Sequence, residues 1–73
     1  MFTREEILPI FAANLKHYRN LAQLSQAALA GKVDIDERQI RRFEAAEQAP
    51  TIVHAYRMAQ VLNIKVDDFF TKR

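Results

Sequence analysis

The 73-residue sequence contains no cysteine and no tryptophan, and only one glycine and two prolines. The absence of cysteine excludes disulfide bonds, cysteine-ligated zinc and thiol nucleophiles. Glycine and proline are too scarce for the many turns of an all-β domain. No apolar run approaches the ~20 residues that span a bilayer, and the N-terminus lacks the layout of a signal peptide. We therefore expect a cytoplasmic protein that does not associate with membranes.

The length fits one small domain, residues 1–73, with a small core. Hydrophobic residues make up 49% and charged residues 27% of the chain, as in ordinary folded domains. The net charge of +2 is too small to indicate nucleic-acid binding by itself. His17 and His54 lie in no metal-binding cluster, and no catalytic set or glycine-rich phosphate loop is visible. The sequence predicts neither a cofactor nor an enzyme.

Apolar periodicity predicts five helical segments. The first spans about residues 4–22, and Thr3 and Glu6 have the spacing of a capping box at its start. Pro9 lies inside this segment, where proline removes a backbone hydrogen bond and clashes with the preceding turn. We therefore expect a kink or break there, with residues 1–9 as an N-terminal extension.

The other four segments are short and have recognisable ends. Ser25 caps residues 25–32, Asp36 opens residues 36–45, Thr51 caps a helix that stops at Asn63, and a last turn covers residues 66–70. Asp34, between the second and third segments, is expected to adopt a positive φ. Side chains at helical spacing predict the core: Phe11, Leu15, Ile40, Phe43, Ile52, Ala55, Leu62 and Phe69.

Residues 25–32 and 36–45 are joined by about three residues, which is the spacing of a helix-turn-helix. The motifs Leu-Ser-Gln-Ala-Ala-Leu-Ala at 24–30, Ile-Arg-Arg-Phe-Glu at 40–44 and Pro-Thr at 50–51 lie in one register. Together with the segment from Tyr56 to Phe70, they resemble the Xre-type, or Cro/repressor-like, helix-turn-helix family. The resemblance covers about residues 10–70. It implies an all-α, five-helix, phage-repressor-like DNA-binding domain.

The resemblance also implies roles for individual side chains. It implies base contacts by Glu37, Arg38 and Arg42, contacts to the DNA backbone by Ser25, Gln26, Gln39 and Arg41, and a structural ion pair between Arg19 and Glu44. Each has a plainer interpretation. The arginines can be a solvated helix face, Ser25 can be only an N-cap, and Glu37 can hold Arg41 four residues away instead of accepting from cytosine N4.

Three positions depart from the family, which usually has glycine where this chain has Asp34, Ala46 and Asn63. Aspartate and asparagine tolerate a positive φ, but alanine does so less easily. We therefore expect the loop at residues 45–50 to differ in shape from that of the family. Glu47, in the same loop, would repel a phosphate.

The function expected from these features is sequence-specific binding of double-stranded DNA by a transcriptional regulator. We expect a repressor, although the sequence does not give the direction of regulation. Residues 36–45 would enter the major groove. We expect a homodimer on an inverted-repeat operator, because one short recognition helix contacts only a few base pairs, and we expect Phe70 and Val66 at the dimer interface. The alternative is a protein-interaction module, such as the antitoxin partner of a toxin pair.

Overall fold

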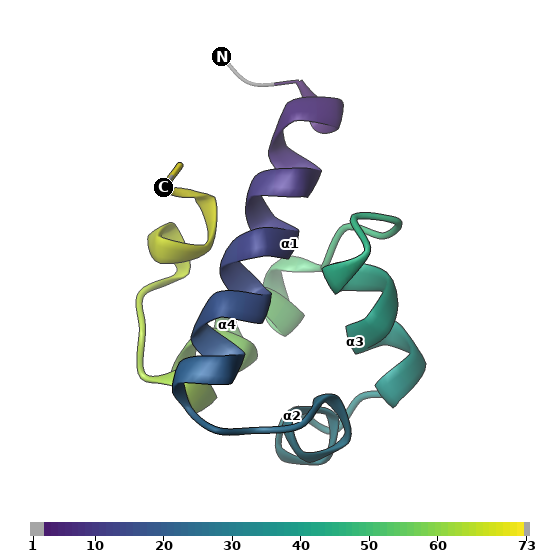
Figure 1. The fold of residues 1–73 in the computed structure, drawn as a ribbon, viewed down its shortest axis with the longest axis vertical. Helices are drawn as coiled ribbons and strands as arrows, with labels where there is room; N and C mark the ends of the chain where they lie inside the picture. The colour runs from purple at the N-terminus through teal and green to yellow at the C-terminus, as the bar shows by residue number, and fades with distance from the viewer. Residues whose placement is uncertain (1–2, 73) are drawn as a thin grey trace.

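The five predicted segments form four α-helices and one 3₁₀-helix in the computed structural model, which describes residues 3–72. They are α1 (Arg4–Leu21), α2 (Gln26–Val33), α3 (Glu37–Glu44), α4 (Ile52–Leu62) and η1 (Val66–Phe70) (Figure 1). The predicted all-α class is confirmed, although the last segment is a 3₁₀-helix. Within residues 3–72, no helix combines the length and apolarity needed to cross a membrane.

Each α-helix begins at a side chain that accepts a hydrogen bond from a free N–H group of the first turn. Thr3 forms the predicted capping box with Glu6. The caps of α2, α3 and α4 are Ser25, Asp36 and Thr51, which accept from the backbone N–H of Ala28, Arg38 and His54, each at 3.0 Å. These caps fix where the helices start and therefore how short the connections between them are.

We expected a kink or a break at Pro9, and α1 is not broken there, because it continues from Arg4 to Leu21. Residues 4–9, expected to be an extension, are the first turns of this helix, and Met1 and Phe2 lie outside the described residues. The hydrogen bond that proline cannot donate would have gone to the carbonyl of Glu5. Glu5 is exposed, so water can satisfy that carbonyl, and the capping box holds the turn before it.

All four α-helices end at a residue with positive φ that is not glycine. These residues are Gln23, Asp34, Ala46 and Asn63, with φ of 60°, 65°, 59° and 58°. After α3, the N–H of Glu47 donates to the carbonyl of Arg42 at 2.9 Å and that of Ala46 to Phe43 at 3.2 Å, which is the hydrogen-bond pattern of a Schellman motif. The expectation that Ala46 would avoid this conformation is therefore wrong. The hydrogen bonds of the helix end outweigh the steric cost of the methyl group, roughly 1–2 kcal/mol.

The core lies where α1, α2, α3, α4 and η1 meet, and α2 contributes Leu29, Ala30 and Val33 to it. Phe11 is at its centre, with the rings of Phe43 and Phe69 edge-on at centroid distances of 5.9 and 5.4 Å. Most predicted core residues are buried, but Ile52 is 83% exposed. Ile52 is the first residue of α4 and lies at the edge of an open groove, so most of its side chain faces solvent.

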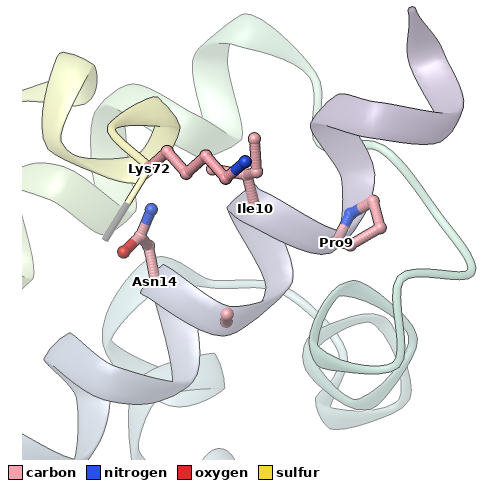
Figure 2. Close-up of a pocket in the computed structure, with 5 residues that line it drawn as sticks. Pro9, Ile10, Asn14 and Lys72 are labelled. Carbon is pink, nitrogen blue, oxygen red and sulfur yellow. The ribbon is translucent and has the colours of Figure 1, made fainter.

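A buried asparagine fastens the C-terminal segment to α1. Asn14 is 1% exposed, and its Nδ2 donates to the carbonyls of Phe69 and Thr71, both at 2.9 Å. Figure 2 shows Asn14 and Ile10 on α1 beside the segment that carries Lys72. No local sequence pattern distinguishes a buried asparagine from a solvated one, so the role of Asn14 could not be predicted.

Candidate nucleic-acid interface

The helix-turn-helix is built around one left-handed residue. Asp34 ends α2, and the N–H of Ile35 then donates to the carbonyl of Ala30 at 3.0 Å. Asp36 follows at once and caps α3, so only three residues separate the two helices. α3 packs on α2 and α1, and Figure 1 shows it on the opposite side of the molecule from η1. One long side of α3 is thereby left uncovered.

The uncovered side of α3 is an arginine face. Ile40 and Phe43 are fully buried, whereas Arg38, Arg41 and Arg42 are exposed. At 3.6 residues per turn, the three arginines lie within an arc of roughly 100°, directly opposite the two buried side chains. Burial of one face therefore aims all three guanidinium groups outward.

The three arginines differ in their partners. Arg41 Nη1 lies 3.1 Å from Glu37 Oε2, in an exposed pair four residues apart. Within residues 3–72, Arg38 and Arg42 make no ion pair and no side-chain hydrogen bond. The outward face thus carries two guanidinium groups without partners and a third held by a carboxylate.

A second, buried ion pair connects α1 to α3. Arg19 Nε and Nη2 donate to Glu44 Oε2 and Oε1 at 2.6 and 3.0 Å, and the two side chains are 10% and 5% exposed. The hydrogen bond to Glu44 is the largest cause that raises the pKa of Arg19 above its ordinary value, against the opposing effect of burial. Arg19 Nη1 also donates to the carbonyl of Leu24 at 2.8 Å. This pair fixes the end of α3 relative to α1.

The side chains predicted to contact the DNA backbone are dispersed around the arginine face. Ser25 is exposed at the start of α2 and Gln39 is half-buried on the flank of α3. Gln26 is half-buried, and its Nε2 donates to Glu44 Oε1 at 3.1 Å. No sequence pattern predicted this hydrogen bond, because it depends on how α2 packs on α3. The other amide hydrogen and the amide oxygen of Gln26 have no partner among the described residues.

Far from the arginine face, an apolar groove lies between the first turns of α1, the start of α4 and η1. Its lining includes Ile7, Ile52, Val66 and Phe70. Phe70 is 37% exposed and stacks on Phe11 at a centroid distance of 5.8 Å, and Val66 is half-buried. The two residues predicted for a dimer interface thus border the groove, but the most exposed apolar side chain beside them is Ile52.

Residues 15–69, from the middle of α1 to η1, match HTH_3, the helix-turn-helix family of Xre/Cro-like domains. The chain belongs to this family. It is a DNA-binding transcriptional regulator of the helix-turn-helix type. Within residues 3–72, no group of three or more histidine or carboxylate side chains is arranged to hold a metal ion.

Individual relatives agree with this assignment. Over 56 residues the chain is 32% identical to an uncharacterized HTH-type transcriptional regulator of Methanocaldococcus jannaschii, with 77% of this chain and 85% of that protein covered. The structure of this chain is similar to that of the restriction-modification controller protein C.AhdI from Aeromonas hydrophila, with a TM-score of 0.82 and 25% identity. The match covers 86% of this chain and 96% of C.AhdI. An HTH_3 family transcriptional regulator from Vibrio cholerae gives a TM-score of 0.85 at 26% identity, with 93% of this chain and 38% of that chain covered.

Proposed function

We propose that this protein binds double-stranded DNA in a sequence-specific manner and acts in the cytoplasm as a transcriptional repressor, with α3 in the major groove. The observation that carries the proposal is the arginine face of α3, opposite the buried Ile40 and Phe43. An α-helix fits the major groove, and a helix-turn-helix presents its second helix to base edges. Similarity to the restriction-modification controller protein C.AhdI supports a regulatory role for this fold.

The proposed contacts follow from exposure and partners. Glu37, Arg38 and Arg42 face the bases, and Arg41 and Gln39 lie beside the backbone. Ser25 and the free amide hydrogen of Gln26 stand at the N-terminus of α2, where backbone N–H groups and the helix dipole favour a phosphate. Because Gln26 also donates to Glu44, a phosphate bound there would be connected to α3 through one side chain.

The proposed working unit is a homodimer on an inverted repeat. A single short recognition helix reads only a few base pairs, whereas a two-fold dimer places two such helices about 34 Å apart in successive major grooves. The groove bordered by Phe70 and Val66 is lined by no residue of α3, so a second copy can cover it while α3 remains free. Ile52 adds apolar surface at the edge of that groove.

Selection of bound duplexes from a random DNA pool tests this function. We expect an inverted-repeat motif, and a log-log plot of affinity against salt with a slope of about −0.9 per phosphate contact. A promoter carrying the selected site should then be transcribed less when the protein is present. Absence of enrichment at low salt would contradict DNA binding, and raised transcription would contradict repression.

A protein-interaction module is the second candidate, and the exposed apolar side chains of α4 favour it. Ile52, Val53 and Tyr56 are more than half exposed, and Glu47 in the preceding loop is acidic. Such a module would bind a protein partner, such as a toxin, through an interface that depends weakly on salt. Steep weakening of duplex binding between 50 and 200 mM salt, on the order of 10³-fold for six contacts, would separate the two functions.

A further inference from the structure

We infer that α3 selects guanine. Arg38 and Arg42 each donate to O6 and N7 of one guanine, so each half-site holds two guanines within about three successive base pairs. The inference rests on the proposed function, because it requires α3 to lie in the major groove. It goes further by naming the bases that this chain reads.

The first support is the state of the two arginines. Both are exposed on the outward face of α3, and neither guanidinium group has an ion-pair or hydrogen-bond partner within residues 3–72. The planar guanidinium group presents two parallel N–H donors, which match the O6 and N7 acceptors of guanine. A guanidinium group already paired with a carboxylate would have to break that pair first.

The spacing of the two arginines sets the spacing of the guanines. Arg38 and Arg42 are four residues apart and lie on the same side of α3, about 6 Å apart along the helix axis. Base pairs are stacked about 3.4 Å apart. The two side chains therefore reach positions about two base-pair steps apart, which gives two guanines within a run of about three base pairs.

The remaining residues of α3 provide no competing reader of A·T pairs. Adenine is usually read by an exposed asparagine or glutamine, and the thymine methyl group by an exposed apolar side chain. The only amide residue of α3 is Gln39, which is half-buried on the flank of the helix. Its apolar residues, Ile40 and Phe43, are fully buried.

Arg41 is less suited to guanine than Arg38 and Arg42, because its guanidinium group is already paired with Glu37 at 3.1 Å on the same exposed surface. The Glu37 carboxylate accepts hydrogen bonds and donates none, so it suits cytosine N4 and repels phosphate. On the outward face, Arg38 and Arg42 thus suit guanine, Glu37 suits cytosine, and Arg41 is paired with Glu37. The half-site should be rich in G·C pairs where α3 lies.

The test uses the whole chain and the duplex obtained by selection. Each guanine of one half-site is replaced in turn by 7-deazaguanine, which lacks the N7 acceptor but keeps Watson–Crick pairing. Replacing a guanine that Arg38 or Arg42 reads should weaken binding about 5- to 100-fold, and replacing any other guanine should change it little.

Charge-conserving variants assign each guanine to its arginine. Arg38→Lys and Arg42→Lys keep the positive charge but lose the fork, so each should lose discrimination at one guanine while the salt dependence of binding stays the same. Arg57→Lys, on an exposed arginine of α4 that has no ion-pair partner among the described residues, is the matched control and should behave like the parent. Thermal melts verify that the variants fold.

The outcomes separate this inference from the proposed function. Specific duplex binding with no guanine in the selected half-site, or with affinity unaffected by every 7-deazaguanine, would overturn guanine reading and leave sequence-specific DNA binding intact. Loss of discrimination at the same base in both lysine variants would overturn the two-guanine arrangement. Failure to bind any duplex would overturn the proposed function, and guanine reading with it.

Discussion

Arg19 and Glu44 are 25 residues apart in the sequence, yet Arg19 Nε lies 2.6 Å from Glu44 Oε2 in a largely buried pair. Gln26 donates to the same carboxylate, so α1, α2 and α3 share one ionic junction. Such a junction is costly to form from solvated charges, and each member depends on the others once it is buried. It determines the position of α3 and therefore that of the arginine face.

Glu44→Gln should destabilise the domain by about 3–5 kcal/mol, because the Arg19 charge would remain buried without a counter-charge. That loss is comparable with the whole stability of a small domain, about 5 kcal/mol. Urea unfolding measures it. Glu37→Gln, which breaks the exposed pair with Arg41, is the control and should cost about 0–1 kcal/mol. Equal effects of the two substitutions would contradict the importance of the buried junction.

Ala46→Gly should stabilise the protein by about 0.5–1 kcal/mol, because glycine adopts the positive φ of 59° without the clash of a Cβ atom. The gain is smaller than the steric cost, since glycine also makes the unfolded chain more flexible. The melting temperature should rise by several degrees, given roughly 4–8 °C per kcal/mol for a domain of this size. Ala45→Gly is the matched control: its φ of −89° does not favour glycine, so it should lower the melting temperature. A fall for both variants would contradict strain at Ala46.

Local chemistry explains what the sequence predicted well. Caps such as Thr3 and Thr51, and stops such as Asp34 and Asn63, act on the backbone within a few residues, so helix boundaries are correct to within one or two positions. Apolar periodicity correctly identified Phe11 and Phe43 as core residues, because spacing within one helix decides which side chains share its buried face. The family resemblance, with several motifs in one register, gave the helix-turn-helix itself.

Predictions from the sequence failed where contacts between residues far apart in the chain, or the hydrogen bonds at a helix end, determine the structure. Ile52 has core spacing but lies at the first position of α4, at the edge of the groove between α1, α4 and η1, where most of its side chain remains exposed. Asn14 is buried only because η1 returns to α1, and Gln26 meets Glu44 only because α2 packs on α3. Pro9 and Ala46 were judged by local preference alone, whereas a hydrogen-bonded helix start and a Schellman motif override that preference.

Asn14→Ala should cost at least about 2 kcal/mol, because the carbonyls of Phe69 and Thr71 would each lose a donor. Asn14→Asp should cost more at neutral pH, since a carboxylate would face two carbonyl oxygens. Lowering the pH restores a donor to that aspartic acid, so the difference from the parent should narrow in acid. Chemical unfolding of the three proteins at several pH values measures this. Equal stability of the aspartate and alanine variants at all pH values would show that the amide hydrogens do not hold η1.

Glu37→Gln should release Arg41 from its ion pair and so strengthen its proposed contact with the DNA backbone. Binding to random DNA should therefore become tighter, and the slope of log affinity against log salt should steepen by at most about 0.9, the value for one full phosphate contact. Discrimination at a cytosine should fall if Glu37 accepts from N4. Fluorescence anisotropy with specific and random duplexes at several salt concentrations measures both effects. Glu47→Gln, in the loop after α3, is the control for the loss of a negative charge alone, and an identical change in both variants would contradict a specific role for the Glu37–Arg41 pair.

Phe70→Glu and Ile52→Glu should each shift the protein from dimer to monomer, because either would place a charge in the apolar groove that a second copy is proposed to cover. Ile52 is 83% exposed, so its substitution leaves the monomer fold intact, whereas Phe70 also stacks on Phe11 and its loss lowers stability. Leu21→Glu, at an exposed leucine near the other end of α1, is the control and should leave the dimer unchanged.

Sedimentation at micromolar concentration measures the mass, and binding to one and two half-sites measures the consequence for DNA. A parent that sediments as a monomer and binds one subunit per site would contradict the dimer. A dimer unaffected by Ile52→Glu would place the interface elsewhere on the molecule.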